Sequence, residues 1–164
     1  KEGEAFTKQF VAKPGCSEHE TGLAIDLARA ARNIDFIRPH LPYDGACGRF
    51  RALAAKYGFI QRYRAEKTAV TGIACEPWHF RYVGAPHAQL IEQNGLCLEE
   101  YAAFLREMGP HRTQIAGGRA AQVLYVPCEN GHARLPGGCV QVSGDNAGGF
   151  IATVWQAGAR RCGA

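Results

Sequence analysis

Two short stretches of the sequence carry side chains that together can bind a metal ion and activate a water molecule. One contains His19 and Asp26, seven positions apart, and the other contains Glu76 and His79, three positions apart. They offer two imidazoles, one carboxylate that can coordinate and one spare carboxylate. A catalytic zinc site has three protein ligands, an open fourth position for water and a general base. The four residues match that set.

The first spacing constrains the local backbone. Seven residues of a straight strand span about 23 Å and place the two ends on opposite faces. His19 and Asp26 can therefore share a metal ion only if the chain folds back between them. Gly22 permits such a turn, because glycine adopts left-handed conformations without strain. We expect the chain to reverse before a short strand that carries Asp26.

The second spacing sets a similar condition. Glu76 and His79 would point to opposite faces of a fully extended strand, so we expect Pro77 to mark a local bend. If His79 is the third ligand, Glu76 can stand beside the metal-bound water without touching the metal. It would then take the proton of the water and pass it to a departing amine. We expect Trp78 to pack beneath the site.

Each pair taken alone has a plainer structural interpretation. A histidine and an aspartate seven positions apart are rarely metal ligands, and a glutamate three positions before a histidine is little more specific. Glu76 could instead be the partner of a nearby arginine such as Arg81. The remaining histidines are expected to be solvated in loops (His40, His111, His132) or structural (His87). The conjunction of two glycine-punctuated segments flanked by strand patterns favours the metal site.

The composition is that of an ordinary globular protein, and it argues against nucleic-acid binding and against a transmembrane segment. The 164 residues are enough for one domain with a core, and 46% of them are hydrophobic and 21% charged. The net charge of +4 comes from scattered Lys and Arg without a dense basic run, so nucleic-acid binding has no support. No apolar run reaches 18 residues, so no transmembrane segment is expected. The seven cysteines contain no Cys-x-x-Cys pair, so we expect mostly free thiols.

Helical and strand patterns alternate without a βαβ rhythm, which predicts an α+β fold with an antiparallel sheet flanked by helices. We expect the face that the 46–57 helix buries to hold Phe50, Leu53, Ala54 and Tyr57. Two regions are predicted, a catalytic domain over 1–112 and a β-rich extension over 113–164. The expected helices are 2–12, 46–57, 86–93 and 98–108, and the expected strands are 23–27, 59–63, 72–74, 78–83, 123–126, 139–142 and 150–155.

The motifs around these residues resemble those of the LAS metallopeptidases. This group contains D-Ala-D-Ala carboxypeptidases and dipeptidases, lysostaphin-type endopeptidases and the hedgehog signalling domain. The motifs are Ser17-x-His19-x-x-Gly22-x-Ala24-x-Asp26 and Glu76-Pro77-Trp78-His79. The longer segments PGCSEHETGLAIDL, YGFIQRY and TGIACEPWHFRYVG are most similar to D,D-peptidases of the VanY and VanXY type. The resemblance covers about residues 1–108 and implies the LAS, hedgehog-like D,D-peptidase fold.

The resemblance also implies a site and a reaction. It implies one zinc ion per chain, bound by His19, Asp26 and His79, with Glu76 as the catalytic base and Ser17 in contact with the substrate. The implied reaction removes the terminal D-Ala from D-Ala-D-Ala-ended peptidoglycan stems or precursors, in cell-wall metabolism or glycopeptide resistance. A D,D-dipeptidase and an L,D-carboxypeptidase on the same scaffold are the close alternatives. A zinc-containing module that binds wall peptides without turnover belongs to another class, and a purely structural wall protein would bind no metal.

Relatives also carry an arginine, within a Ser-Gly-Tyr-Arg-like segment, that helps to bind substrate and polarise the scissile carbonyl. We expect this segment upstream of Lys1, so that the catalytic domain lacks its N-terminal part. Arg62, Arg64 and Arg81 are candidates to replace the arginine on composition alone, and we expect Arg81 to pair with a carboxylate. The compartment stays open. Free cysteines slightly favour the cytoplasm, and an anchor upstream of Lys1 would place the protein at the cell wall.

Overall fold

The computed structural model describes residues 15–114 and 120–156. The helix predicted over 2–12 and the part of the chain beyond Gln156 lie outside the described residues. Among the helices that are described, none has the length and apolar character needed to cross a membrane.

The chain forms two compact units, Lys1–Glu99 and Glu100–Ala164. The division falls inside helix α5 (Leu98–Met108), which has the bounds predicted from the sequence. The functional boundary between residues 112 and 113 stays a prediction.

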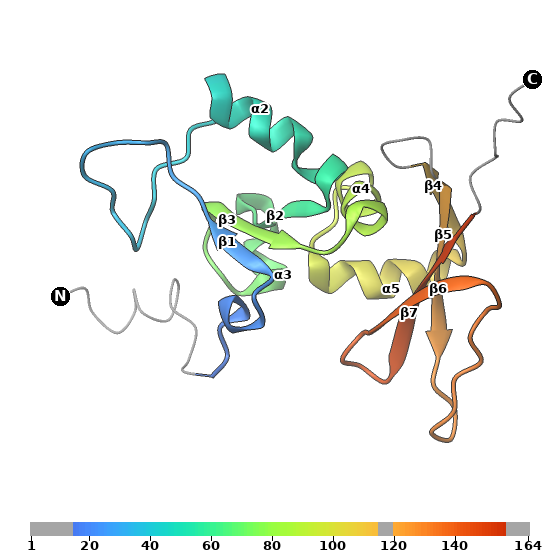
Figure 1. The fold of residues 1–164 in the computed structure, drawn as a ribbon. Helices are drawn as coiled ribbons and strands as arrows, with labels where there is room; N and C mark the ends of the chain where they lie inside the picture. The colour runs from blue at the N-terminus through green and yellow to red at the C-terminus, as the bar shows by residue number, and fades with distance from the viewer. Residues whose placement is uncertain (1–14, 115–119, 157–164) are drawn as a thin grey trace, which may run out of the picture. The chain divides into compact units, whose positions relative to one another are not determined.

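The first unit is built around a three-stranded antiparallel sheet (Figure 1). Its central strand, β3 (Glu76–Tyr82), pairs with β1 (Ala24–Asp26) on one side and with β2 (Phe59–Tyr63) on the other. β-Branched and aromatic residues, which pack well on a pleated surface, favour these segments as strands. Three of the four strands predicted in this part of the chain are confirmed.

The fourth predicted strand, at 72–74, is wrong. Gly72 has a φ of 71°, a left-handed conformation that ends a short helix, and the residues after it form a loop. The helices predicted over 46–57 and 86–93 are confirmed, the first as an α-helix that tightens into a 3₁₀ turn. With 3₁₀ helices labelled η, the helices of this unit are η1 (Glu18–Thr21), α2 (Gly45–Ala54), η2 (Ala55–Tyr57), η3 (Ala65–Lys67), α3 (Thr68–Thr71) and α4 (Ala85–Gln93).

Helix α2 packs against one face of the sheet and forms a core with it. Two of the four residues predicted on the buried face of this helix are instead exposed, Leu53 at 44% and Tyr57 at 61%. The α-helix ends at Ala54, and the tighter 3₁₀ winding of η2 turns Tyr57 away from the sheet. The buried residues of this core are Leu41, Ala54, Trp78 and Phe80, and Leu27, Cys47, Phe50 and Phe59 pack against them.

The register between β2 and β3 shifts in the middle of the pair. Gln61 lies opposite Phe80, but Tyr63 lies opposite Glu76, so β3 takes four residue steps where β2 takes two. The extra residues of β3 form a bulge between Glu76 and Phe80. A bulge bends its strand and re-aims the side chains next to it. The bend predicted at Pro77 takes this form, within a continuous strand.

Arg51 of α2 holds this bulge from the core side. Its Nη2 donates to the carbonyl oxygens of Pro77 (2.6 Å) and Leu41 (2.8 Å), and its Nη1 donates to Gln61 Oε1 (2.7 Å). Its Nε donates to the Pro42 carbonyl at 3.3 Å. One guanidinium therefore joins the loop before α2, strand β2 and the irregular part of β3. The rigid fork of donors in arginine suits this role, which a lysine could not fill.

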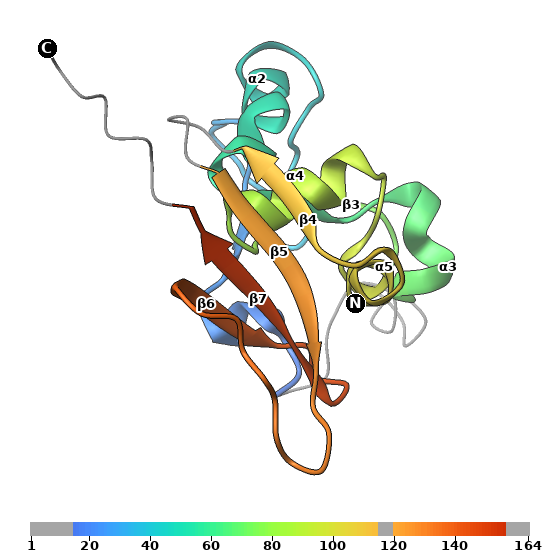
Figure 2. The same cartoon turned by 90° about the vertical axis from the view of Figure 1, so that its right-hand side faces the viewer.

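The second unit contains a four-stranded antiparallel sheet of order β4-β5-β7-β6 (Figure 2). The three strands predicted in this region are confirmed, and β4 was not predicted. Its sequence, His-Arg-Thr-Gln, has no apolar alternation, and β4 is a strand because its backbone pairs with β5. The placement of His111 in a loop is therefore wrong. The strands are β4 (His111–Gln114), β5 (Ala120–Pro127), β6 (Cys139–Gly144) and β7 (Gly149–Trp155).

Five cysteines are free thiols, as the sequence predicts. They are Cys16, Cys47, Cys75, Cys97 and Cys128.

Replacing Arg51 with Met should destabilise the protein by about 2–4 kcal/mol, because the carbonyls of Pro77 and Leu41 would lose their donor in a partly buried place. Chemical denaturation gives the free energy of unfolding. Arg49→Met is the matched control, since Arg49 is exposed on the same helix and its replacement should change stability by only about 0.5 kcal/mol. Equal stability of the two variants would contradict the role given to Arg51.

His87 of α4 should make stability depend on pH. Burial lowers the pKa of His87 to about 4, whereas a histidine in the unfolded chain titrates near about 6.5. Between these values the unfolded state binds more protons, so the free energy of unfolding should fall as the pH drops from about 6.5 towards 4, with a slope of at most about 1.4 kcal/mol per pH unit.

The contribution of His87 is the difference between the wild type and a His87→Asn variant, measured by denaturation at several pH values. His40→Asn is the control, because His40 is exposed. If His87→Asn keeps the full pH slope of the wild type, the neutral imidazole of His87 is not its source.

Candidate metal and catalytic site

A tight turn brings the two ends of the first motif together. The 3₁₀ helix η1 begins after Ser17 and ends at Thr21, and Gly22 caps it with a left-handed φ of 71°. The Gly22 N–H donates to the His19 carbonyl at 3.0 Å. The chain reverses here and enters β1, so the predicted fold-back is confirmed. His19 Nε2 lies 3.5 Å from Asp26 Oδ1.

The pairing of β1 with β3 adds the third side chain. Asp26 lies directly opposite His79, and cross-strand neighbours in an antiparallel pair share a face. His79 Nδ1 lies 2.9 Å from Asp26 Oδ1. One possible ligand atom each from His19, Asp26 and His79 lies within 4.8 Å of the other two. Three residues from two distant segments thus converge on one point.

This donor set fits a zinc ion. Two imidazole nitrogens and a carboxylate oxygen are ligands that zinc binds at about 2.0–2.2 Å, and tetrahedral geometry then separates the ligand atoms by about 3.3–3.6 Å. The distances of 3.5 Å and 2.9 Å around Asp26 Oδ1 are close to that range. Three protein ligands leave one tetrahedral position for another molecule.

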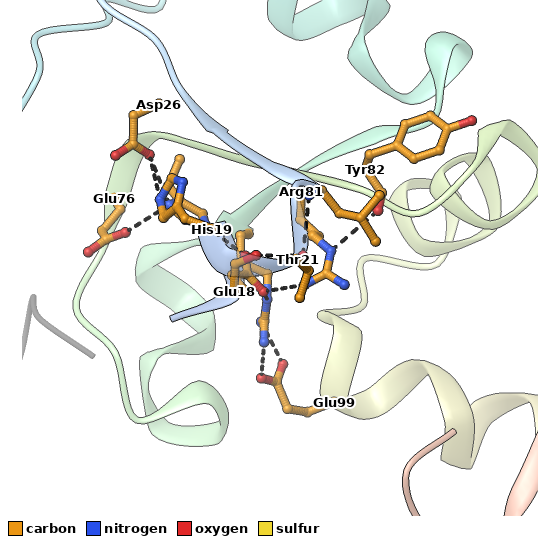
Figure 3. A network of polar contacts seen from close by, with 11 residues as sticks. Glu18, His19, Thr21, Asp26, Glu76, Arg81, Tyr82 and Glu99 are labelled. Carbon is orange, nitrogen blue, oxygen red and sulfur yellow. Dashed lines mark hydrogen bonds and ion pairs between the residues drawn. The ribbon is translucent and has the colours of Figure 1, made fainter. Parts of the chain in front are cut away.

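The bulge in β3 turns Glu76 towards the same side of the sheet. Glu76 Oε2 lies 3.6 Å from His79 Nδ1, and the Glu76 side chain lies below that of Asp26 in Figure 3. Only 9% of the Glu76 side chain is exposed. Burial raises the pKa of Glu76 most, the positive charge of His79 opposes that effect, and the outcome in the metal-free protein is a pKa of about 7. The nearby carboxylates of Asp26 and Glu18 also raise it. A carboxyl group with a pKa near neutrality can both accept and release a proton.

Glu18 is a site residue that was not predicted from the sequence. Its Oε1 lies 2.6 Å from His79 Nε2, on the side of the imidazole ring away from Asp26. Burial raises the pKa of Glu18, but the hydrogen bond with His79 and the charges of Arg62 and Arg81 outweigh burial and lower the pKa to about 2. Burial likewise lowers the pKa of His79, and its bonds with Asp26 and Glu18 outweigh it, so that this pKa is about 9 in the metal-free protein.

The three arginines considered as substrate-binding candidates all contact carboxylates. Arg81 Nη1 lies 2.8 Å from Glu18 Oε2, so the carboxylate partner expected for Arg81 is Glu18 (Figure 3). Arg62 Nε lies 3.2 Å from the same oxygen, and its two terminal nitrogens lie 2.9 and 2.6 Å from the Glu99 carboxylate. Arg64 pairs with Glu92.

Glu18 was not predicted because its contacts are with residues far away in the sequence. Glu18 stands between the motif residues Ser17 and His19, and the motif assigns no role to this position. The turn that brings Glu18 to His79 has no apolar periodicity from which its direction could be predicted. A charged residue inside a motif of potential ligands was the one available signal.

The site opens into a cavity of about 260 Å³. Ser17 lines this cavity, and its contact with the substrate stays a prediction. Trp78 lines it as well and also belongs to the core of the first unit, in agreement with its predicted place beneath the site. The other lining residues are Cys16, Glu18, His19, Asp26, Ile37, Arg62, Tyr63, Ile73, Glu76 and His79.

Several known proteins are similar to this chain in sequence and in fold. A bifunctional D-Ala-D-Ala dipeptidase and D-Ala-D-Ala carboxypeptidase, VanXYC of Enterococcus gallinarum, is 50% identical over 106 residues, which are 64% of this chain and 56% of that protein. A D-alanyl-D-alanine carboxypeptidase of Enterococcus faecium is 33% identical over 148 residues, 90% of this chain and 46% of the relative. The chain therefore spans about half the length of the curated relatives it matches.

A solved structure confirms the predicted fold class. The crystal structure of the vancomycin resistance D,D-dipeptidase VanXYg, in complex with a D-Ala-D-Ala phosphinate analogue, superposes with a TM-score of 0.86 at 44% identity. The match covers 95% of this chain and 64% of that one. Residues 1–85 also match the family model for VanY, D-alanyl-D-alanine carboxypeptidase. With more than half of its length matched in this way, the chain belongs to the VanY family.

Proposed function

We propose that this chain is the catalytic part of a zinc-dependent D,D-carboxypeptidase. Its substrate would be a peptidoglycan stem or precursor that ends in D-Ala-D-Ala, and its product the shortened peptide and free D-Ala. One observation carries the proposal. His19, Asp26 and His79 offer three converging ligand atoms, and the buried Glu76 carboxylate stands beside them on the same side of the sheet.

His19, Asp26 and His79 would hold the zinc ion. When bound, zinc supplies Lewis acidity, which makes a water molecule more acidic and polarises the scissile carbonyl. Two of its ligands, His19 and Asp26, have side chains that are 42% and 34% exposed. The open side of the site therefore faces the cavity in which the peptide end would bind.

Glu76 would carry the proton. It accepts one proton from the attacking water as the oxygen–carbon bond forms at the carbonyl carbon of the penultimate residue. It then gives that proton to the nitrogen of the terminal D-Ala as the carbon–nitrogen bond breaks. Ser17, at the cavity wall, would contact the substrate.

A D,D-dipeptidase is the second candidate, since the relative from Enterococcus gallinarum bears both activities in its name. An L,D-carboxypeptidase uses the same site chemistry. Assays with a D-Ala-D-Ala-ended pentapeptide, free D-Ala-D-Ala and a tetrapeptide stem separate the three. Hydrolysis of none of them by a zinc-loaded protein would favour a binding module instead.

Glu76→Gln keeps the shape of the side chain and removes its ability to accept a proton. We expect turnover of a D-Ala-D-Ala-ended peptide to fall by about 10²–10⁴-fold, the usual effect of losing a general base, while zinc content and folding persist. Turnover is measured as release of D-Ala under saturating substrate.

Glu66→Gln is the control for that experiment, because Glu66 is exposed. It should leave turnover unchanged. Comparable turnover by wild type and a well-folded Glu76→Gln protein would end the catalytic assignment of Glu76.

Loss of a ligand should remove the metal. His79→Ala deletes one of three ligands and should lower zinc content after dialysis from about one ion per chain to a small fraction, and the loss should also lower thermal stability, because metal binding is coupled to folding. Metal analysis measures the first effect and thermal denaturation the second. His40→Ala, which changes an exposed imidazole, should retain the metal. Full zinc retention by His79→Ala would exclude His79 from the site.

A further inference from the structure

The two ring nitrogens of His79 face different partners. Nδ1 points to the cluster, 2.9 Å from Asp26 Oδ1. Nε2 points away from it and lies 2.6 Å from Glu18 Oε1. An imidazole that binds a metal ion is neutral and carries one proton, so one nitrogen donates and the other offers its lone pair. The arrangement divides these two tasks between opposite sides of the ring.

We propose that Glu18 is a positioning residue that prepares His79 to bind the metal through Nδ1. The proposal rests on the zinc site proposed above and deepens it. When His79 binds the metal, the Glu18 carboxylate accepts a hydrogen bond from the Nε2–H group and so selects the tautomer in which Nδ1 offers its lone pair. The same hydrogen bond fixes the rotation of the ring about its bond to the strand. Carboxylates that accept a hydrogen bond from a ligating histidine also make the other nitrogen more basic.

The surroundings of Glu18 fit this role. Its two oxygens are used separately, since Oε1 contacts His79 and Oε2 contacts two arginines. Arg62 Nε lies 3.2 Å and Arg81 Nη1 lies 2.8 Å from Oε2. Two guanidinium groups on one oxygen keep the carboxylate charged and leave the other oxygen directed at the imidazole. Charge-assisted hydrogen bonds of this kind are shorter and stronger than neutral ones.

The arginines are themselves held from separate elements. Arg62 comes from β2 and Arg81 from β3, and Arg62 also binds the Glu99 carboxylate through both terminal nitrogens. The side chain of Glu18 is 15% exposed, that of Arg62 10% and that of Arg81 18%. Such a set of charges with little solvent around it has few alternative arrangements. Glu18 is therefore fixed before any metal arrives, and it fixes His79 in turn.

The test is the zinc affinity of Glu18→Gln, measured by competition with a chelator of known affinity for Zn²⁺. Glutamine keeps the length of the side chain, but its amide nitrogen cannot accept a hydrogen bond. If that nitrogen faces His79, the bond with Nε2 is lost. If it faces the two arginines, their contacts are lost instead. We expect zinc to bind about 10–100-fold more weakly, the effect found when such a partner of a ligating histidine is replaced.

Glu20→Gln is the matched control, because Glu20 is an exposed carboxylate of the same helical turn. It should bind zinc as tightly as the wild type. If Glu18 acts only through the fold, Glu18→Gln would lower the melting temperature and leave the zinc affinity of the folded protein unchanged. That result would overturn the proposal.

A measurement on the wild type keeps the proposal testable if Glu18→Gln does not fold. In the zinc-loaded protein with ¹⁵N-labelled histidine, NMR should show His79 with a proton on Nε2 and the metal on Nδ1. A proton on Nδ1 would refute the role of Glu18. Neither experiment uses peptide hydrolysis, so a protein that fails to cleave D-Ala-D-Ala can still confirm or refute the role of Glu18.

Discussion

The site depends on the register of one strand. β3 lies between β1 and β2, and its pairing with β1 sets His79 opposite Asp26. A slip of one residue would send His79 to the core face and bring Phe80 or Trp78 into the site, because side chains alternate between faces. Trp78 and Phe80 are buried in the core under α2, so burial of these two aromatic residues opposes such a slip. The same packing that stabilises the first unit thus fixes the position of the candidate ligand.

Regular alternation of the side chains along β3 would not have placed Glu76 in the site. It would have pointed Glu76 to the core face, on the same side as Trp78 and Phe80. The bulge between Glu76 and Phe80 changes this, and Arg51 binds the carbonyl of Pro77 inside it. A local departure from ideal strand geometry therefore places the proposed base, Glu76. The guanidinium group of Arg51 stabilises this bulge. Bulges near functional sites commonly serve to re-aim a side chain.

Sequence reasoning could name residues whose proposed role follows from their type and spacing. His19, Asp26, Glu76 and His79 were named from the motifs, and the fold-back followed from Gly22. The strands with apolar alternation were found, whereas β4 was missed because backbone pairing alone defines it. Glu18 and Arg51 could not be found in this way. Both act through partners that are between 9 and 63 positions away, and nothing local in the sequence marks such contacts.

The two halves of the site differ in how firmly the fold holds them. His79 and Glu76 belong to the central strand, and their side chains are 5% and 9% exposed. His19 and Asp26 belong to a 3₁₀ turn and to a strand of three residues, with side chains that are 42% and 34% exposed.

Glu18 links the halves, since it lies in the turn and binds His79 of the central strand. A metal ion bound by His19, Asp26 and His79 would add a second link between them. The exposed half can then admit metal and substrate, while the buried half keeps the base and one ligand in fixed positions. Preorganisation of the groups that carry charge in the reaction requires such a fixed half.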